Sequence, residues 1–238
     1  MSILNHSPTI VRDGLIYCID ATAKQSYSGS GSVWKNIVDN NVYKGTITNA
    51  TFNWQPVGGT GGSYFSFDGS DDYVEAETNV TPATGPFSAV IWIKVTDLSA
   101  GGGRGGLFER QESSPYNGMS FGKGGPGIWY FSVSGLDPAN NLTASTTYPT
   151  VGVWGSYCGT YNGSTDVAFY HNDSLVDSDS GVDQGNLDAE GARLPLKLAR
   201  RDTTELPCEI AHVAIYNVEL TYQQIKQNYR ALKGRFGL

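Results

Sequence analysis

The sequence is poor in charged residues and in sulfur. Only 16% of its 238 residues are charged, and it has three cysteines and two methionines. The number of cysteines is odd, and each one lies in or beside a strand-like run: Cys18, Cys158 and Cys208. We therefore expect buried free thiols in a protein made in a reducing cytosol, and a core large enough to fold without disulfides.

Long hydrophobic runs and a signal peptide are also missing. Residues 1–13 have neither a basic n-region nor an apolar h-region. No window approaches the run of about 18 apolar residues that a membrane-spanning helix needs. The sequence therefore predicts synthesis in the cytoplasm and no membrane insertion.

Basic residues are too few for nucleic acid to be a partner. The net charge is −7 and the pI is near 4.9, whereas phosphate binding requires clustered Lys and Arg. Residues 193–238 nevertheless hold eight of the sixteen basic residues and only four acidic ones. This excess is either a solvated surface or a docking surface for an acidic partner. The candidate docking residues are Lys226, Arg230, Lys233 and Arg235.

The composition that remains is typical of a β protein. There are 30 glycines, 14 tyrosines and five tryptophans, which suits turns and an aromatic core. In the stretch YFSFDGSDDYV (64–74), Phe65 and Phe67 alternate with Tyr64 and Ser66 before an acidic turn at Gly69. This alternation predicts a half-buried strand on each side of the turn.

About twelve to fourteen short strands are expected along the chain, at the spacing of a two-sheet sandwich. Residues 87–95 (FSAVIWIKV) predict a central strand that is buried on both faces. Residues 154–161 and 167–171, joined by NGSTD, predict a hairpin. The other strands are expected at 15–19, 43–48, 52–54, 107–111, 118–122, 128–133, 194–199 and 209–216.

One helix follows the last strand. Thr221 and Gln224 form a capping box, and Gly234 is expected to stop the helix. Its apolar stripe consists of Tyr222, Ile225, Tyr229 and Leu232.

In this order, these elements resemble the laminin-G-like, concanavalin-A-type jelly-roll family. The resemblance covers about residues 13–233, and residues 13–238 are expected to form one domain after an extended arm at 1–12. It is carried by GLIYCIDA, FSFDGSDDYV, FSAVIWIKV, WGSYCGTYNGS…VAFYHNDSLV and LKLARR…EIAHVAIYN followed by LTYQQIKQNY. The fold class implied is an all-β, two-sheet antiparallel jelly roll with one short C-terminal helix.

The opening GLIYCIDA and the ending NYRALKGRFGL look like the version found in structural proteins of tailed bacteriophages. That resemblance implies a non-enzymatic virion protein, such as a capsid decoration or a fibre component, on the virion surface. Its partners would be capsid or tail subunits, and other copies of the chain if it is a homo-oligomer. The alternative is a carbohydrate-binding module for cell-surface or environmental glycans, and a polysaccharide hydrolase comes third.

The acidic turn offers a candidate calcium site at Asp68, Asp71 and Asp72, because Ca²⁺ binds six to eight oxygens. Many relatives carry an Asp in the last long strand, and in relatives that bind Ca²⁺ such acidic residues contribute to the site. This chain has Ile-Ala-His at 210–212 instead. The other interpretation is that the aspartates accept backbone N–H bonds of the turn.

For glycans, Tyr116, Asn117 and Trp129 combine aromatic faces with an amide. A buried core position is the alternative for Trp129.

Four patterns resemble catalytic motifs but are not expected to take part in catalysis. Glu75 and Glu77 share a strand face, but the E-x-D-x-E pattern of the glucanases is absent. G-x-S-x-G at 118–122 is followed by KGGPG, and G-x-G-x-x-G at 101–106 by no helix, so neither has its required context. His171 and His212 are expected to be ordinary sheet residues.

Overall fold

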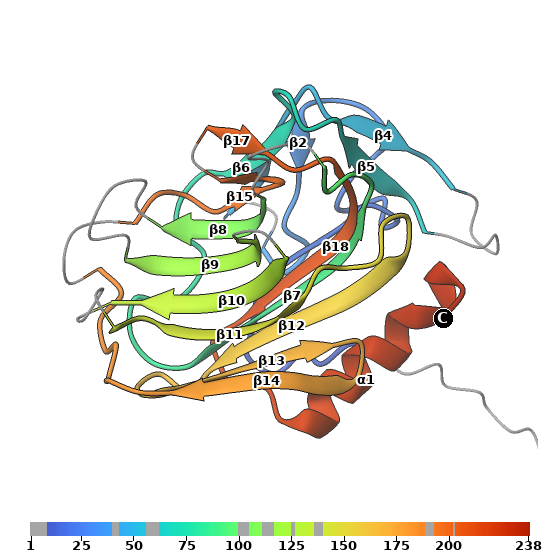
Figure 1. Ribbon diagram of the computed structural model, residues 1–238. Coiled ribbons are helices and arrows are strands. Elements are labelled where there is room, and N and C mark those ends of the chain that lie inside the picture. Colours follow the sequence, from blue (N-terminus) through green and yellow to red (C-terminus); the bar gives the residue numbers. More distant parts are fainter. Residues whose placement is uncertain are drawn as a thin grey trace, which may run out of the picture.

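A computed structural model describes residues 9–39, 43–55, 62–99, 105–110, 117–124, 127–135, 140–188, 193–201 and 203–238. Tyr116, most of the loop 101–106 and the first eight residues of the expected arm lie outside these ranges. The described residues form two large antiparallel sheets that pack face to face, with a helix on the outer face of one of them (Figure 1). The predicted all-β sandwich with one C-terminal helix is therefore confirmed.

The first sheet, sheet A, is built around the apolar strand β7. Its strand order is β14 (Ser174–Ser180), β13 (Asp166–His171), β12 (Trp154–Tyr161), β7 (Phe87–Val95), β18 (Cys208–Tyr216), β5 (Tyr64–Phe67) and β4 (Thr51–Asn53). β1 (Leu15–Asp20) pairs with the second half of β18. The predicted hairpin is the β12–β13 pair.

The second sheet, sheet B, supplies the other half of the core. Its order is β11 (Leu142–Thr147), β10 (Ile128–Ser134), β9 (Gly118–Lys123), β8 (Gly106–Arg110), β15 (Lys197–Leu198), β6 (Tyr73–Ala76), β3 (Gly45–Thr48) and β2 (Val33–Trp34). β16 (Arg200–Arg201) and β17 (Thr204–Glu205) form a small separate pair.

β7 is covered on both faces, as predicted. Phe87 and Ile91 lie in the cluster between the sheets, whereas Trp92 lies in a second cluster with Leu232 and Phe236 from the C-terminal end of the chain. Trp92 stacks on Phe236 with ring centroids 4.5 Å apart. A continuous apolar run is needed here because the sandwich covers one face of the strand and the helix covers the other.

The two-residue strands β2, β16 and β17 were not predicted, and neither were the longer β11 and β14, whose sequences are mostly polar. β11 reads LTASTT, where only Leu142 and Ala144 reach the core, and β14 reads SLVDSDS, where no residue is fully buried. The carboxylates of Asp177 and Asp179 accept hydrogen bonds from the backbone N–H groups of Ser145 and Thr143, both at 2.8 Å. Side chains of sheet A thus hold its edge strand against the edge of sheet B.

The predicted strand 194–199 is shorter than expected. Only Lys197 and Leu198 join the ladder. The strand ends there because Ala199 adopts a φ of +62°. A residue with a positive φ lies outside the extended region of backbone conformation and therefore cannot continue a strand.

A half-buried strand lies on each side of the acidic turn in the stretch 64–74, as predicted. Burial alternates along β5, where Phe65 and Phe67 are buried. The two strands, however, belong to different sheets, so the acidic turn carries the chain across the sandwich. Gly69 has a φ of +83°, and a Cβ there would lie 2.4 Å from the ring of Pro207. Only glycine fits this turn.

The helix α1 (Tyr222–Leu232) has the predicted capping box at Thr221. Its stripe differs from the prediction: Tyr222 is 45% exposed, and Asn228 is buried instead. Gly234 does not end the helical path, because the chain continues as the 3₁₀ helix η2 (Lys233–Phe236) and turns at Gly237, with φ +73°. Within the described part of the chain, no helix is both long enough and apolar enough to cross a membrane.

Candidate functional site

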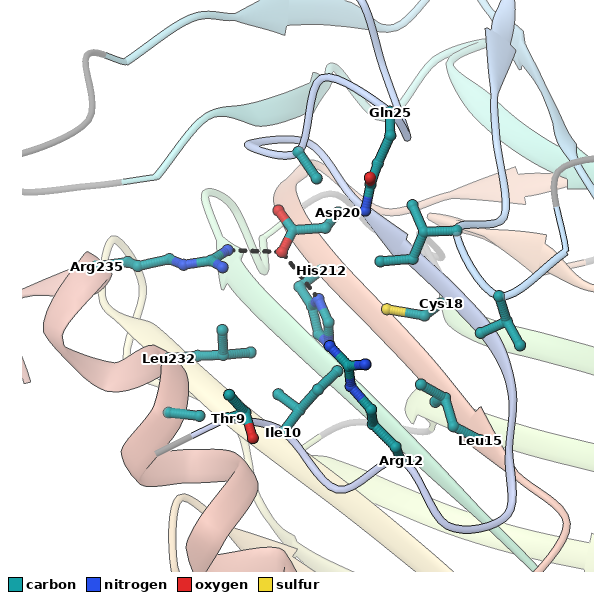
Figure 2. A pocket seen from close by; sticks show the side chains of 14 residues that line it. Thr9, Ile10, Arg12, Leu15, Cys18, Asp20, Gln25, His212, Leu232 and Arg235 are labelled. Carbon is teal, nitrogen blue, oxygen red and sulfur yellow. Dashed lines mark hydrogen bonds and ion pairs between the residues drawn. The ribbon is translucent and has the colours of Figure 1, made fainter. Parts of the chain in front are cut away.

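The described residues enclose a pocket of about 690 Å³ beside α1. It lies between residues 9–12, here called the N-terminal strap, and β1, β18, the loops at 23–25 and 37–38, and the end of α1 with η2 (Figure 2). We call it the strap pocket. Its walls come from both ends of the sequence, which β1 brings together by pairing with β18.

The N-terminal strap is held against α1 by buried amide and hydroxyl groups. The Val11 N–H donates to Asn228 Oδ1 at 2.8 Å, and the Tyr216 hydroxyl donates to the Val11 carbonyl at 3.1 Å. Asn228 Nδ2 donates in turn to the Tyr216 hydroxyl oxygen at 3.1 Å. Gln227 Nε2 donates to the Thr9 carbonyl at 2.8 Å. This network explains the buried Asn228 in the helix stripe and fixes one wall of the pocket.

A charged cluster forms the floor of the pocket. Asp20, the last residue of β1, lies opposite His212 of β18 in the strand register, and both are at most 5% exposed. Arg235 Nη1 donates to Asp20 Oδ2 at 2.7 Å. The other carboxylate oxygen, Oδ1, accepts the Thr22 N–H at 2.9 Å. Figure 2 shows Arg235 reaching from η2 to this carboxylate.

The cluster keeps Asp20 ionised. Burial by itself would raise the pKa of this carboxyl, but His212 and Arg235 outweigh it and hold the pKa well below its usual range. His212 Nδ1 lies 3.4 Å from Asp20 Oδ2. This distance is long for a hydrogen bond, so the pair is a close electrostatic contact.

The remaining walls are mostly apolar. Ile10, Leu15, Ile37, Val38 and Leu232 line the pocket, and Val38 is 45% exposed at its mouth. A concave site of this kind, with apolar walls and a few fixed polar groups, suits the binding of a small ligand.

Cys18 also lines the pocket, yet it is not a nucleophile. Burial, and next the Asp20 charge, raise the pKa of the Cys18 thiol. A thiol that stays protonated is unreactive. All three cysteines are free and buried, as predicted.

Sequence reasoning missed this site. The sequence predicts His212 to be an ordinary sheet residue, whereas the structure places it on the pocket floor. A weak signal was present, because Asp20 and His212 each interrupt or end an apolar strand that should otherwise be buried.

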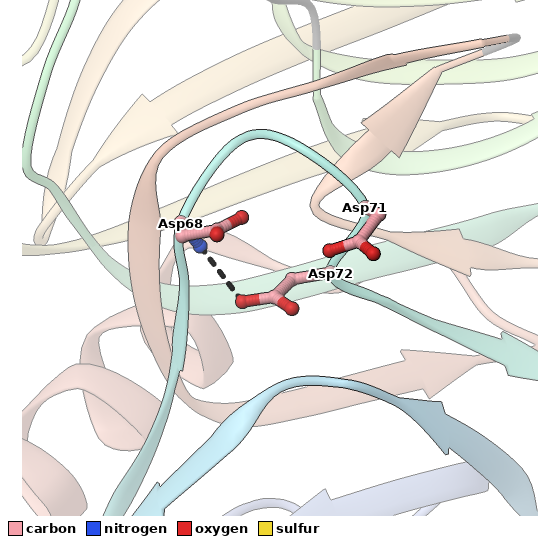
Figure 3. A group of neighbouring side chains, drawn as sticks. All are labelled: Asp68, Asp71 and Asp72. Atoms are coloured by element: carbon pink, nitrogen blue, oxygen red, sulfur yellow. Dashed lines mark hydrogen bonds between the residues drawn. The ribbon is translucent and has the colours of Figure 1, made fainter.

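The acidic turn brings its three aspartates together, with carboxylate oxygens within 4.8 Å of one another (Figure 3). Each already accepts a hydrogen bond: Asp68 from the Ser70 N–H, Asp71 from Asn49 Nδ2, and Asp72 from the Asp68 N–H. Burial, together with the charges of Asp68 and Asp71, raises the pKa of Asp72. These hydrogen bonds are the ones that the turn-stabilising interpretation predicts, and the calcium site stays a prediction.

Of the residues predicted to bind glycans, Tyr116 lies outside the described residues, and the other two are buried. Asn117 is 0% exposed and donates from Nδ2 to the Leu187 carbonyl at 2.7 Å. Trp129 is also 0% exposed and packs between the sheets. The outward position on β10 belongs to the next residue, Tyr130, whose hydroxyl accepts from Arg201 Nη1 at 3.2 Å. Because neighbouring strand residues face opposite sides, a shift of one residue moves the aromatic ring into the core.

The other sequence patterns are placed as follows. Glu77 is exposed and pairs with Lys44 at 3.0 Å, and Glu75 is half-buried in β6. Ser120 lies in the middle of β9, so the G-x-S-x-G pattern forms no strand–turn–helix elbow. His171 stacks on Tyr157 with centroids 4.6 Å apart.

The structure separates the four candidate docking residues into two groups. Arg230 is exposed, and the ammonium groups of Lys226 and Lys233 each lie 5.5 Å from the ring centroid of a helix tyrosine. Arg235, by contrast, is committed to Asp20 inside the strap pocket. The role of all four residues in docking an acidic partner stays a prediction.

Similar folds occur in several solved structures. The binding domain of Botulinum Neurotoxin DC in complex with SialylT has a TM-score of 0.67 and 15% identity, over 92% of this chain and 52% of that chain. The binding domain of Paraclostridial Mosquitocidal Protein 1 has a TM-score of 0.64 and 14% identity, over 91% and 52%. Trypanosoma rangeli sialidase in complex with sialic acid has a TM-score of 0.62 and 16% identity, over 94% and 34%.

These similarities concern the fold alone, and this chain spans about half or less of each of the three proteins. They lend no support to the expected phage origin. No curated protein matches the chain. A family profile described as the concanavalin A-like lectin/glucanases superfamily matches residues 68–226, which is well over half of the sequence. The chain belongs to the concanavalin A-like lectin/glucanases superfamily.

Proposed function

We propose that this protein is a carbohydrate-binding module and that the strap pocket is its binding site. The observation that carries the proposal is the pocket itself: about 690 Å³, with apolar walls around a fixed charged floor. Sugars present hydroxyl groups for hydrogen bonding and C–H faces for apolar contact, and the pocket supplies both kinds of surface.

The similar structures support a binding role. Two of them are binding domains, one in complex with SialylT, and a third is a sialidase in complex with sialic acid. Those ligands belong to those proteins, whose chains are longer than this one. What supports the same class of ligand here is the lectin-type fold together with a pocket that has polar groups already in position.

The proposed role is binding without turnover. Cys18 is a protonated thiol, and Ser120 lies within a strand, so neither is placed as an activated nucleophile. Hydrolysis of any substrate in a polysaccharide panel, if abolished by Glu75→Gln, would overturn this part of the proposal.

A glycan array probed with the labelled full chain tests the binding role. Val38→Trp should block the pocket mouth and abolish the signals, because Val38 is 45% exposed and lines the pocket. Val151→Trp is the matched control, since Val151 is 48% exposed and is not a pocket residue. Equal signals from both variants would contradict the assignment of the pocket, and an array without signals would contradict glycan binding.

A second candidate is a virion structural role, in which the protein lies on a particle surface and docks on capsid or tail subunits. It is favoured by one observation, the basic residues Lys226, Arg230 and Lys233 on α1 and η2 of an acidic chain. Mass spectrometry of purified particles tests it, and absence of the protein from the particles would refute it.

A further inference from the structure

We propose that the strap pocket binds acidic sugars through their carboxylate, which it holds between Arg12 and Arg235. This inference deepens the proposed function and rests on it. The pocket lies in a protein of net charge −7, yet the charged residues that line it are two arginines and one aspartate.

The one acidic group of the pocket is already fully engaged. Asp20 Oδ2 accepts from Arg235 Nη1 at 2.7 Å and lies 3.4 Å from His212 Nδ1. Its Oδ1 accepts the Thr22 N–H at 2.9 Å. Asp20 therefore acts as a support that fixes the Arg235 guanidinium, and its charge is balanced by its neighbours.

The positive charge that remains is available to a ligand. Arg12 is exposed and lines the pocket, and no ion pair joins it to another described residue. Arg235 uses Nη1 for Asp20, and its side chain remains 35% exposed. In Figure 2, Arg12 rises from the strap and Arg235 enters from η2, so two guanidinium groups border one recess.

Guanidinium groups select carboxylates by geometry as well as by charge. Their planar N–H donors match the two oxygens of a carboxylate in a bidentate pair, and such pairs are stronger than neutral hydrogen bonds. Leu15 and Leu232 line the same pocket and offer apolar contact for the C–H groups of a sugar ring. A sugar that carries a carboxylate forms the charge-assisted pair in addition to the apolar contacts, whereas a neutral sugar offers the arginines only its hydroxyl groups.

Isothermal titration calorimetry with two ligand pairs tests the proposal. The first pair is sialyllactose and lactose, and the second is digalacturonic acid and its methyl ester, which keeps the ring shape and removes the charge. We expect the acidic member to bind at least about tenfold more tightly in at least one pair. The difference should shrink as NaCl is raised from low to high concentration, because salt screens exposed charges.

Variants assign the effect to the pocket. Arg12→Gln should remove most of the preference for the acidic sugar. Lys35→Gln removes the same charge from an exposed residue outside the strap pocket and should leave the preference unchanged. Arg235→Lys keeps the charge but loses the planar donor pair, so it should weaken the acidic ligand more than the neutral one.

The outcomes separate this inference from the proposed function. If acidic and neutral sugars bind equally and Val38→Trp abolishes both, the pocket binds glycans but the carboxylate inference is wrong. Equal effects of Arg12→Gln and Lys35→Gln would also overturn it. Tight binding of sulfated lactose, equal to that of sialyllactose, would refute the selection of carboxylates. If no sugar binds, the proposed function itself fails.

Discussion

The buried ion pair between Arg193 and Glu109 should be the most sensitive point for stability in the sandwich. Arg193 Nη1 lies 2.7 Å from Glu109 Oε1, and the two side chains are 2% and 0% exposed. Nη1 also donates to Thr81 Oγ1 at 2.6 Å, and Arg193 Nε donates to Asp188 Oδ1 at 2.8 Å. The Val80 and Thr81 N–H groups donate to the Glu109 carboxylate.

We expect Arg193→Met to lower the free energy of unfolding by about 3–5 kcal/mol, the range found when one partner of a buried pair is removed. The lower end applies here, because Glu109 keeps its hydrogen bonds from residues 80 and 81. Replacing both partners, in Glu109→Leu with Arg193→Met, should recover much of the loss because no buried charge is then left unpaired.

The loss of unfolding free energy in Arg193→Met should depend on pH. Burial raises the pKa of Glu109 to about 7, even though Arg193 and the hydrogen bonds from Thr81 and Val80 oppose the shift. Removing Arg193 removes a group that lowers this pKa, so it should rise further. A carboxyl whose folded pKa is raised contributes stability below its unfolded pKa and loses it as pH rises through the folded value. Arg193→Met should therefore be more destabilising at pH 8 than at pH 5.

Urea unfolding followed by tryptophan fluorescence at pH 5 and pH 8 measures both effects. Lys44→Met is the control: it breaks the Lys44–Glu77 pair, whose side chains are 41% and 44% exposed. An exposed pair of this kind is worth about 1 kcal/mol or less. If Arg193→Met loses no more than this control at pH 8, the reasoning about the buried pair is wrong.

Four further predictions follow from individual contacts. Phe236→Ala should lower the free energy of unfolding by about 3 kcal/mol, because the ring stacks on Trp92 at 4.5 Å; a calorimetric loss below about 1 kcal/mol would contradict this. The folded pKa of Asp20 is lowered, so its contribution is present above the unfolded pKa and is lost as pH falls through the folded value. Asp20→Asn should therefore flatten the loss of stability between about pH 4 and pH 2 in urea titrations, and an unchanged acid limb would count against the pocket electrostatics. The melting temperature should be the same in EDTA as in millimolar calcium, because every carboxylate of the acidic turn already accepts a hydrogen bond; a rise of several degrees with calcium would restore the metal site. The three buried cysteines should not react with a thiol reagent such as DTNB in the native state, and fast labelling without denaturant would refute their burial.

Local patterns in the sequence were enough for the architecture. The alternation in residues 64–67, the apolar run of β7, the β12–β13 hairpin and the capping box at Thr221 all appear in the structure as predicted. Each depends on neighbours within a few residues, because side-chain direction follows the period of the backbone. The same reasoning failed for β11 and β14, whose sequences have too few apolar residues to make the period visible.

Local patterns did not predict which side of the sandwich a side chain faces or which strands pair with each other. Trp129 and Tyr130 are adjacent in sequence, and only the position of β10 in the sandwich decides which ring packs in the core between the sheets. The acidic turn joins two sheets rather than two neighbouring strands, which no local pattern indicates.

The sequence by itself therefore determined an all-β sandwich with free buried thiols and a capped C-terminal helix, since periodicity and end signals are local. Only the tertiary structure decided the site. Asp20 and Arg235 are 215 positions apart, and they meet because β1 pairs with β18 and η2 folds back over that edge. The packing of whole sheets decides which distant side chains meet, because nothing in the sequence around a charged residue indicates its distant partner.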